Sequence, residues 1–436
     1  MMSRPMNDPL RISLTSLGCK VNYAEMESLA GVLAASGCDI VDDDAPADVV
    51  VVNTCTVTLQ ADATSRQRIQ HLRRQHPLSH LIVTGCSVDG NPGFYLSSPT
   101  PSGHPLTIDA VFANSTKESI ATYIRTNLFP SASELPPESS DTVFPLRRGR
   151  AFIKVQDGCR HRCTYCSVWS ARGASRSRAV DDILADIRSA AARGHRECVL
   201  TGVDLGSYGR DTDSSLPELV WRIWNEVSDM RIRLSSINAN DITEDVIALN
   251  ANERFCPHWH IPLQSGSDAI LKTMHRGYRR SQFLRVVEQL RHLRPETTVT
   301  TDIMTAFPGE TDEDHGQTCE LIKEAKFLKA HVFRYSPRPG TPAAQLGEQI
   351  PAHIARRRSA ELRMLAGETG RAEHERFVGI RLHPAWLMQD GDEWVGIAET
   401  YHEVRIPFTD SLAIGTISPV TITHSTGTTL LGALPQ

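Results

Sequence analysis

Short apolar runs alternate with amphipathic stretches along the first part of the chain. The apolar runs cover residues 12–17, 49–52 and 81–83, and helical periodicity is present at residues 25–35 and 66–74. A run of this length between turn residues is typical of a buried parallel strand, and the amphipathic stretches are typical of crossover helices. The alternation predicts a doubly wound α/β domain.

A second series of strand-like runs follows at residues 199–201, 231–234 and 299–303, again with helical stretches between them. Repeated βα units of this kind predict a parallel barrel, or part of one, with its site at the carboxyl ends of the strands. Short β-like runs separated by Gly and Asp come last, at residues 385–388, 393–397, 404–407 and 418–423. These runs predict a small C-terminal β-barrel.

Length and composition divide this pattern into parts. A chain of 436 residues is too long for one ordinary core, and its hydrophobic content of 40% is enough to pack several. A stretch rich in Pro, Ser and acidic residues at 130–142 has the composition of a linker. The expected parts are an N-terminal domain at 1–129, a linker at 130–146, a barrel core at 147–350, a helical connector at 351–375 and the β-barrel at 376–436.

The sequence gives no indication of a membrane segment. Residues 1–10 lack an apolar signal core, and no run approaches the roughly 20 apolar residues of a membrane span. We therefore expect a cytoplasmic protein without membrane contact, and we expect a monomer. Ten cysteines in a large cytosolic chain indicate metal-binding or catalytic groups rather than disulfides.

Three cysteines, Cys159, Cys163 and Cys166, lie on one short loop at C-x3-C-x2-C spacing. Thiolates are the usual ligands of 4Fe-4S clusters, normally four per cluster, so a set of three leaves one iron without a protein ligand. An open metal position predicts substrate binding. The alternatives are inert thiols or a zinc loop with His161 as a further ligand. Zinc is disfavoured because no second ligand pair follows nearby.

A second set of cysteines, Cys19, Cys55 and Cys86, stands just beyond the ends of the three N-terminal apolar runs. Loops after the carboxyl ends of parallel strands meet at one edge of a sheet, so the three thiols are expected to converge. They predict a second 4Fe-4S cluster with an open iron. The alternative is three buried core thiols, since free Cys is among the most buried residue types. Their position outside the apolar runs favours the cluster.

The cysteine loop, with Tyr165 before its last cysteine, resembles the signature of radical S-adenosylmethionine (SAM) enzymes, and the chain resembles their methylthiotransferase family. The N-terminal segments that carry the likeness are Leu17-Gly18-Cys19-Lys20-Val21-Asn22, Asn53-Thr54-Cys55-Thr56-Val57-Thr58 and Thr84-Gly85-Cys86. Further matches are Val155-Gln156-Asp157-Gly158, Ala171-Arg172-Gly173, Leu200-Thr201-Gly202, Arg233-Leu234-Ser235-Ser236-Ile237, His260-Ile261-Pro262-Leu263-Gln264-Ser265-Gly266-Ser267, Phe307-Pro308-Gly309-Glu310-Thr311 and Tyr335-Ser336-Pro337-Arg338-Pro339-Gly340-Thr341.

The resemblance implies two 4Fe-4S clusters and SAM as cofactors. The cluster on the loop would bind SAM at its open iron and cleave it to methionine and a 5′-deoxyadenosyl radical. The cluster on the N-terminal cysteines would hold sulfur, which another SAM methylates. Acid–base catalysis cannot replace this chemistry, because the aromatic carbon that receives sulfur carries no proton that is acidic near neutral pH.

Within the family, the hexapeptide around Cys19 is similar to the branch that converts N6-threonylcarbamoyladenosine, beside the tRNA anticodon, to its 2-methylthio derivative. The partners then expected are tRNA, a reductive electron donor and a sulfur donor. Two alternatives use the same chemistry, on isopentenyladenosine in tRNA or on a ribosomal protein side chain. An alternative of another class is a non-enzymatic module that binds zinc or RNA.

The resemblance also implies which residues surround SAM at the carboxyl ends of the barrel strands. They are Tyr165, Gly202, Val203, Asp204, Asn238, Gln264, Ser265 and Gly309. A glycine in such a turn can equally serve only the backbone geometry. The chain departs from the family pattern at Asn238, where glutamate is common, at Ala306 in place of glycine, and at Arg334 in place of proline.

RNA contacts are expected from arginines around the radical loop, because cationic side chains supply most of the affinity for phosphate. The candidates are Arg147, Arg148, Arg150, Arg172, Arg176 and Arg178. The last domain is similar to the family's RNA-binding TRAM barrel, yet its acidic residues outnumber its arginines, and the chain has a net charge of −5. A solvated charged face is the alternative interpretation of these arginines.

Overall fold

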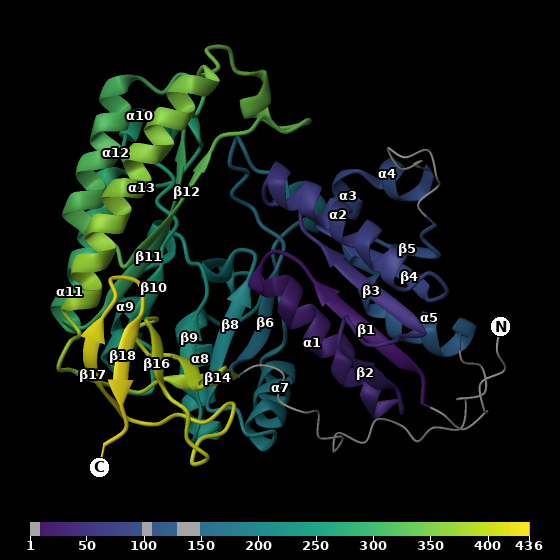
Figure 1. Cartoon of the computed structure of the whole chain (residues 1–436). Helices are drawn as coiled ribbons and strands as arrows, with labels where there is room; N and C mark the ends of the chain where they lie inside the picture. The colour runs from purple at the N-terminus through teal and green to yellow at the C-terminus, as the bar shows by residue number, and fades with distance from the viewer. Residues whose placement is uncertain (1–8, 98–106, 129–148, 436) are drawn as a thin grey trace. The chain divides into compact units, whose positions relative to one another are not determined.

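The computed structural model describes residues 9–97, 107–128 and 149–435 (Figure 1). The chain forms two compact units. One comprises Met1–Phe144 with Cys166–Ala174, and the other comprises Pro145–Tyr165 with Ser175–Gln436. The predicted linker, with Arg147 and Arg148, lies outside the described residues, and the predicted domain boundaries stay a prediction.

The first unit is built on a parallel sheet with strand order β2-β1-β3-β4-β5. Its strands are β1 (Arg11–Ser16), β2 (Asp39–Val41), β3 (Val49–Thr54), β4 (His80–Gly85) and β5 (Ala110–Phe112). Its helices are α1 (Lys20–Ala35), α2 (Leu59–Gln75), α3 (Cys86–Gly90), α4 (Pro92–Ser97), α5 (Ile120–Tyr123) and α6 (Val168–Arg172), with a 3-10 turn at Asn114–Ser119. The predicted doubly wound α/β domain is confirmed.

The central strand β3 is buried along its whole length because helices cover both faces of the sheet. Val49 and Val51 pack into one apolar cluster with residues of α1, and Val50 and Val52 pack into another with residues of α2. Successive side chains of a strand point to opposite faces, so a run of four valines serves two cores at once.

The second unit contains six parallel strands that follow one another in sequence order. They are β6 (Ala151–Asp157), β8 (Glu197–Gly202), β9 (Arg231–Leu234), β10 (His258–His260), β11 (Thr298–Thr305) and β12 (Lys329–Arg334). Ladders join β6 to β8 to β9 and β10 to β11 to β12, and a parallel bridge between Ser236 and His260 continues the order from β9 to β10. The short β7 (Arg176–Ser177) pairs antiparallel with β6. The predicted partial barrel is confirmed.

Helices flank these strands, and a large apolar core fills the space between them. They are α7 (Val180–Ala192), α8 (Leu216–Glu226), α9 (Glu244–Ala248), α10 (Asp268–Thr273), α11 (Arg280–Leu293), α12 (Asp312–Ala325) and α13 (Ala352–Glu375). The long α13 packs along α12 and β12 (Figure 1). Among the described residues, no helix has both the length and the apolar character needed to cross a membrane.

The chain continues into a six-stranded, mostly antiparallel sheet with order β13-β17-β18-β16-β15-β14. Its strands are β13 (Arg381–Leu382), β14 (Ala385–Asp390), β15 (Glu393–Ile397), β16 (Glu403–Pro407), β17 (Val420–Ser425) and β18 (Leu430–Ala433). Trp386 and Trp394 pack in its core. The sequence pattern missed β18, which is short and contains Gly432, a residue of low strand propensity.

A buried ion cluster joins this C-terminal sheet to the amino ends of the barrel strands. Glu197, the first residue of β8, is fully buried and accepts hydrogen bonds from Arg233 at 2.7 Å and Arg231 at 2.5 Å. Arg233 also donates to the two carbonyl oxygens of residues 398–399, at 2.9 and 3.0 Å. Burial opposes ionisation of the Glu197 carboxyl, yet Arg233, Arg231 and Arg150 hold its pKa well below the ordinary value.

The turn at 398–401 covers the amino ends of two further strands. Thr298, the first residue of β11, donates to the carbonyl oxygen of Thr400 at 2.6 Å. His258, the first residue of β10, stacks on Tyr401 with ring centroids 4.1 Å apart. The C-terminal sheet therefore closes the barrel at the end opposite to the carboxyl ends of its strands.

Arg150 belongs to the same buried cluster. Its guanidinium lies 3.6 Å from the carboxylate of Glu197 and over the ring of Tyr401, and only 12% of the side chain is exposed. A phosphate contact needs a cation that reaches the surface. The guanidinium of Arg150 neutralises a core carboxylate, which disfavours the RNA contact predicted there; that contact stays a prediction.

Replacing Glu197 with glutamine is expected to lower the free energy of unfolding of the second unit by about 3–5 kcal/mol, because it leaves buried guanidinium groups without their anion. Glu197 has a lowered pKa in the folded state, so its contribution is present above about pH 4.3 and is lost as the pH falls below that value. Denaturant unfolding followed by tryptophan fluorescence measures the difference. Glu226→Gln, which breaks partly exposed ion pairs on α8, is the control and should cost no more than about 1 kcal/mol. Equal effects of the two changes would contradict the assignment.

Candidate functional site

The loop that carries Cys159, Cys163 and Cys166 begins where β6 ends. Gly158 has φ +73°, a left-handed backbone that glycine adopts without strain, and it turns the chain out of the strand. The side-chain amide of Gln156 donates to the carbonyl oxygens on both sides of this turn, each at 2.8 Å. The sequence therefore fixes the entry of the loop through one glycine and one buried amide.

Backbone amides donate to two sulfurs of this loop. The amide of His161 lies 3.5 Å from Sγ of Cys159, and the amide of Val168 lies 3.4 Å from Sγ of Cys166. Hydrogen bonds to cysteine sulfur stabilise the thiolate form and tune iron–sulfur clusters. Three thiols at this spacing, two of them with amide donors, are a donor set that fits a cubane cluster.

A chain of hydrogen bonds runs from Cys163 along the carboxyl ends of β9 and β8. Arg276 donates to Sγ of Cys163 at 3.4 Å and to Oδ1 of Asn238. Asn238 then donates from Nδ2 to Oδ1 of Asp204 at 3.3 Å. A glutamate at position 238 would bring a second carboxylate against Asp204, and like charges at this distance repel. The neutral amide links Arg276 to Asp204 without that cost.

His161 faces two buried carboxylates. Its Nε2 lies 3.1 Å from Oδ1 of Asp204 and 3.5 Å from Oδ2 of Asp241. The hydrogen bonds with Asp204 and Asp241 raise the pKa of His161 to about 10, so the ring is an imidazolium at neutral pH. The ring therefore acts as the counter-ion of two carboxylates, and the zinc-ligand alternative for His161 is not needed to explain its position.

Gln264 combines two features that are common where a ligand binds. Its φ of +67° is unusual for a residue with a side chain, and hydrogen bonds with Asp302 and Met304, both 2.8 Å, hold it in place. Its Oε1 is buried and has no hydrogen-bond partner in the part of the chain that the structure describes. Strained backbone and an unpaired buried acceptor both call for a functional explanation.

The other residues predicted around SAM have backbone or packing roles in the structure. A Cβ at Gly202 would lie 2.8 Å from Oε1 of Gln156, so close approach requires glycine there. Gly309 has φ +80°, a turn conformation. Tyr165 packs edge-on against Phe307 with centroids 6.5 Å apart. Of the last two residues, Ser265 is buried and Val203 is partly exposed.

The second cysteine set converges in the first unit. Cys19 precedes α1, Cys55 follows β3 and Cys86 begins α3 directly after β4. A Cβ at Gly18 would lie 2.3 Å from Sγ of Cys55, so the loop of the first cysteine rests on the second. Asn22 ties the two loops together, because its Nδ2 donates to the carbonyl oxygens before each cysteine, at 2.7 and 2.9 Å.

Electrostatics also places Cys19 beside Cys86. Burial raises the pKa of the Cys19 thiol, the Arg172 guanidinium opposes this shift, and negative charge on Cys86 adds to it. Arg172 lies 3.1 Å from Sγ of Cys86 through its Nε. Buried thiols without a metal are costly to ionise, whereas a bound metal deprotonates them. The donor chemistry therefore fits a metal cluster.

The arginines predicted to bind RNA separate into different environments. Arg172 is buried, with 1% of its side chain exposed and a 2.8 Å ion pair to Glu25, which disfavours the RNA contact predicted there. Arg178 donates to Asp186 at 2.8 Å and is about one-third exposed. Arg176 is exposed. RNA contacts at Arg176 and Arg178 stay predictions.

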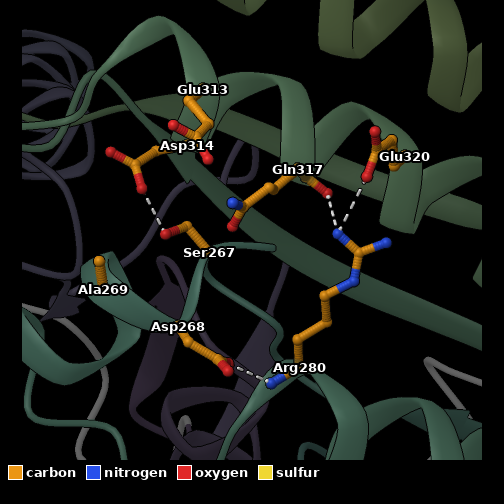
Figure 2. A pocket seen from close by; sticks show the side chains of 8 residues that line it. All are labelled: Ser267, Asp268, Ala269, Arg280, Glu313, Asp314, Gln317 and Glu320. Carbon is orange, nitrogen blue, oxygen red and sulfur yellow. Dashed lines mark hydrogen bonds and ion pairs between the residues drawn. The ribbon is translucent and has the colours of Figure 1, made fainter.

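A surface hollow of about 630 Å³ lies between α10, α11 and α12 (Figure 2). Arg280 reaches across it to Glu320 at 3.3 Å, and Asp314 accepts a hydrogen bond from Ser267. None of the predicted site residues is among those that line the hollow. Within this lining, the ion pair between Arg280 and Glu320 joins α11 to α12.

Sequence reasoning missed Gln156 and Arg276 as residues of the site, and it expected an RNA contact at Arg172 in place of its contact with Cys86. Gln156 and Arg172 stand inside matched motifs, but a motif does not state which atoms its side chains touch. Arg276 lies outside the matched segments, and its contact with Cys163 spans more than a hundred residues of sequence. The guanidinium of Arg276 also lies over the ring of Tyr278, a contact that only the structure shows.

Two family models match the chain. The radical SAM superfamily matches residues 153–322, and the uncharacterized protein family UPF0004 matches residues 11–98. Among solved structures, the radical SAM methyltransferase TsrM of Kitasatospora setae, with tryptophan and a SAM analogue bound, has a TM-score of 0.54 at 16% identity and covers 77% of this chain and 75% of its own. That likeness concerns the fold.

Curated relatives are more similar in sequence. The threonylcarbamoyladenosine tRNA methylthiotransferase MtaB of Thermotoga maritima is 36% identical over 376 residues, which cover 84% of each chain. MtaB of Bacillus subtilis is 34% identical over 94% of this chain and 93% of its own. The tRNA-2-methylthio-N6-dimethylallyladenosine synthase of Frankia alni is 34% identical over 84% of this chain and 75% of its own.

The two family models span both cysteine sets, the relatives are matched over most of their length, and together they confirm the resemblance drawn from the motifs. The chain belongs to the methylthiotransferase family of radical SAM enzymes and is MtaB-like.

Proposed function

We propose that this protein is a tRNA methylthiotransferase that converts N6-threonylcarbamoyladenosine next to the anticodon to its 2-methylthio derivative. The observation that carries the proposal is the presence of two separate sets of three cysteines, one on the radical loop and one at the carboxyl edge of the N-terminal sheet. Sulfur insertion at an inert aromatic C–H position needs both a radical source and bound sulfur, and cofactors must supply them. Membership in the radical SAM superfamily implies a 4Fe-4S cluster and SAM.

The residues beside Cys163 are suited to hold SAM. When bound, the cluster and SAM supply a 5′-deoxyadenosyl radical that removes a hydrogen atom from the substrate. Asp204 offers a carboxylate to the ammonium group of SAM, and Asn238 and Arg276 keep that carboxylate in place. The unpaired Oε1 of Gln264 offers a further acceptor. The task of these side chains is to orient SAM and exclude water from it.

Cys19, Cys55 and Cys86 would hold the second cluster, whose open iron carries the sulfur to be transferred. Support comes from the three positions directly after strand ends and from the contact of Cys55 with Gly18. The backbone of Gly18 packs against Cys55 on one side of this site. A closed structural site would need a fourth thiolate.

The remaining partners follow from the reaction. The protein would take tRNA as substrate, with Arg176 and Arg178 as phosphate contacts, and would use a reductive electron donor and a sulfur donor. We propose that it acts as a monomer in the cytoplasm.

The proposed reaction is tested by mass spectrometry of nucleosides from tRNA of a strain without this gene. We expect 2-methylthio-N6-threonylcarbamoyladenosine to disappear, its unthiolated precursor to accumulate, and both to return to normal when the wild-type gene is restored. Restoration with Cys159→Ala is the control and should not rescue. Persistence of the thiolated nucleoside without the gene, in a strain with no second such enzyme, would contradict the proposal.

The second candidate is isopentenyladenosine, because several relatives at 33–34% identity carry that activity in their names. The same digest decides between them, since the two thiolated nucleosides differ in mass. Selective loss of the 2-methylthio-isopentenyl nucleoside would assign the protein to that branch. An unchanged profile of all tRNA nucleosides would point to a ribosomal protein as substrate.

A further inference from the structure

A buried group of charges lies against the second cysteine set in the first unit. It consists of Arg172, Glu25 and Lys117, with side chains 1%, 6% and 8% exposed. Glu25 accepts from Lys117 at 2.5 Å and from Arg172 at 2.8 Å. Buried ions are costly unless they are paired; Glu25 pairs with both cations, and the partly buried carboxylate of Asp89 also interacts with them. Within this group, Arg172 is the cation that contacts a cysteine of the second set, at Cys86.

The guanidinium of Arg172 is fully engaged, and one of its contacts is a predicted cluster ligand. Nε donates to Sγ of Cys86 at 3.1 Å, one terminal nitrogen donates to Glu25, and the other donates to Asn22 at 2.8 Å. Asn22 is the residue that ties the loops of Cys19 and Cys55 together. Arg172 thus contacts Cys86 directly, and it contacts Asn22, which holds the loops of Cys19 and Cys55. A planar fork makes three such bonds at fixed angles, which an ammonium group cannot do.

The positive charge of Arg172 lies where a cluster on Cys19, Cys55 and Cys86 would bring negative charge. Three thiolates bound to an oxidised cubane give the cluster a net negative charge, and a sulfide or methylthiolate on the open iron adds to it. The nearest cation to Cys86 in the described residues is Arg172, and Asn114 provides a weaker second donor at 3.7 Å. Potentials of iron–sulfur clusters depend on net charge and on hydrogen bonds to sulfur.

We propose that Arg172 is a positioning residue of the second cluster: it fixes the Cys86 thiolate and compensates the negative charge of the cluster on Cys19, Cys55 and Cys86. This inference rests on the proposed function, which assigns the cluster to those cysteines. Arg172 stands six residues after Cys166 in the sequence, so the segment that ends the radical motif also completes the surroundings of the other cluster.

The test uses the full chain with Cys159, Cys163 and Cys166 all replaced by alanine, so that only the second cluster is counted. After anaerobic reconstitution, iron and sulfide per chain, the rate of iron release to a chelator and the reduction potential are measured. The variants are Arg172→Gln, Arg172→Lys and Glu25→Gln. Arg74→Gln, at an exposed arginine on α2 of the same unit, is the matched control.

Arg172→Gln is expected to lower the reduction potential and to speed iron release about 10- to 100-fold, the usual cost of losing a residue that supports metal ligands. Arg172→Lys should keep most of the potential, because the charge remains, and should still release iron faster. Glu25→Gln should shift the potential upward, because it removes a negative charge. The opposite signs of the Arg172 and Glu25 shifts distinguish charge compensation from general loosening of the fold.

An unchanged potential and release rate in Arg172→Gln would overturn the inference, as would shifts of the same sign in Arg172→Gln and Glu25→Gln. If the parent chain with intact Arg172 binds no iron and sulfide, the proposed second cluster itself fails. Circular dichroism of each apo variant checks that the α/β unit is folded. If Arg172→Gln does not fold, the Arg172→Lys and Glu25→Gln pair still gives both the release rate and the sign of the shift.

Discussion

Cys159→Ala is expected to abolish the reductive cleavage of SAM by the reconstituted enzyme. The loop offers three thiolates for one cluster, and a cubane held by only two protein ligands loses iron instead of presenting one open position. The measurement is the formation of 5′-deoxyadenosine and methionine under anaerobic conditions with a chemical reductant. Iron content should fall from about eight to about four atoms per chain, because the second cluster is untouched.

The matched control for this prediction is Cys38→Ala. Cys38 is a free thiol that belongs to neither cysteine set and packs at the edge of an apolar cluster of the first unit. The Cys38→Ala variant should cleave SAM at the wild-type rate and bind the wild-type amount of iron. Cleavage of SAM by Cys159→Ala above the background rate would contradict the assignment of Cys159 as a ligand of the radical cluster.

Cys55→Ala is expected to separate the two halves of the reaction. The variant should still cleave SAM, because the radical loop is intact, and should form no methylthiolated nucleoside, because the second cluster has lost a ligand next to Gly18. Both products are measured in one assay on tRNA that carries N6-threonylcarbamoyladenosine without the methylthio group, by chromatography for 5′-deoxyadenosine and by mass spectrometry for the nucleoside. Loss of sulfur transfer should be complete within detection.

Cys55→Ser separates loss of the thiolate ligand from loss of packing, because serine nearly keeps the volume of the side chain. It should behave like Cys55→Ala. Normal methylthiolation by both variants would show that Cys55 does not hold the sulfur-carrying cluster. Loss of SAM cleavage together with sulfur transfer, in protein that is folded by circular dichroism, would contradict the division of labour between the two sets.

The strands and the cysteines could be predicted because both depend on local sequence. The four valines of β3 determine a strand that is buried on both faces. Parallel strands end at a common edge of the sheet, so the sequence alone predicted that Cys19, Cys55 and Cys86 lie near one another. The radical loop needs only the spacing of Cys159 to Cys166.

The roles of the arginines could not be predicted, because they depend on partners far away in sequence. Arg150 pairs with Glu197 and Arg172 pairs with Glu25, and no local pattern distinguishes such a buried cation from one on a solvated face. The link from Arg276 to Asn238 is of the same kind. It explains in structural terms why a neutral amide can replace the expected glutamate.

The C-terminal sheet and the predicted SAM site lie at opposite ends of the barrel strands. Residues 398–401 touch the first residues of β10 and β11, whereas Asp204, Asn238 and Gln264 follow the last residues of their strands. A six-residue strand separates the two ends by about 20 Å. The residues that close the amino end of the barrel are therefore different from those at its carboxyl end, and we expect substitutions in the C-terminal sheet to change stability more than the reaction. The acidic character of the C-terminal sheet is compatible with this structural role, because closing the amino end of a barrel does not require phosphate binding.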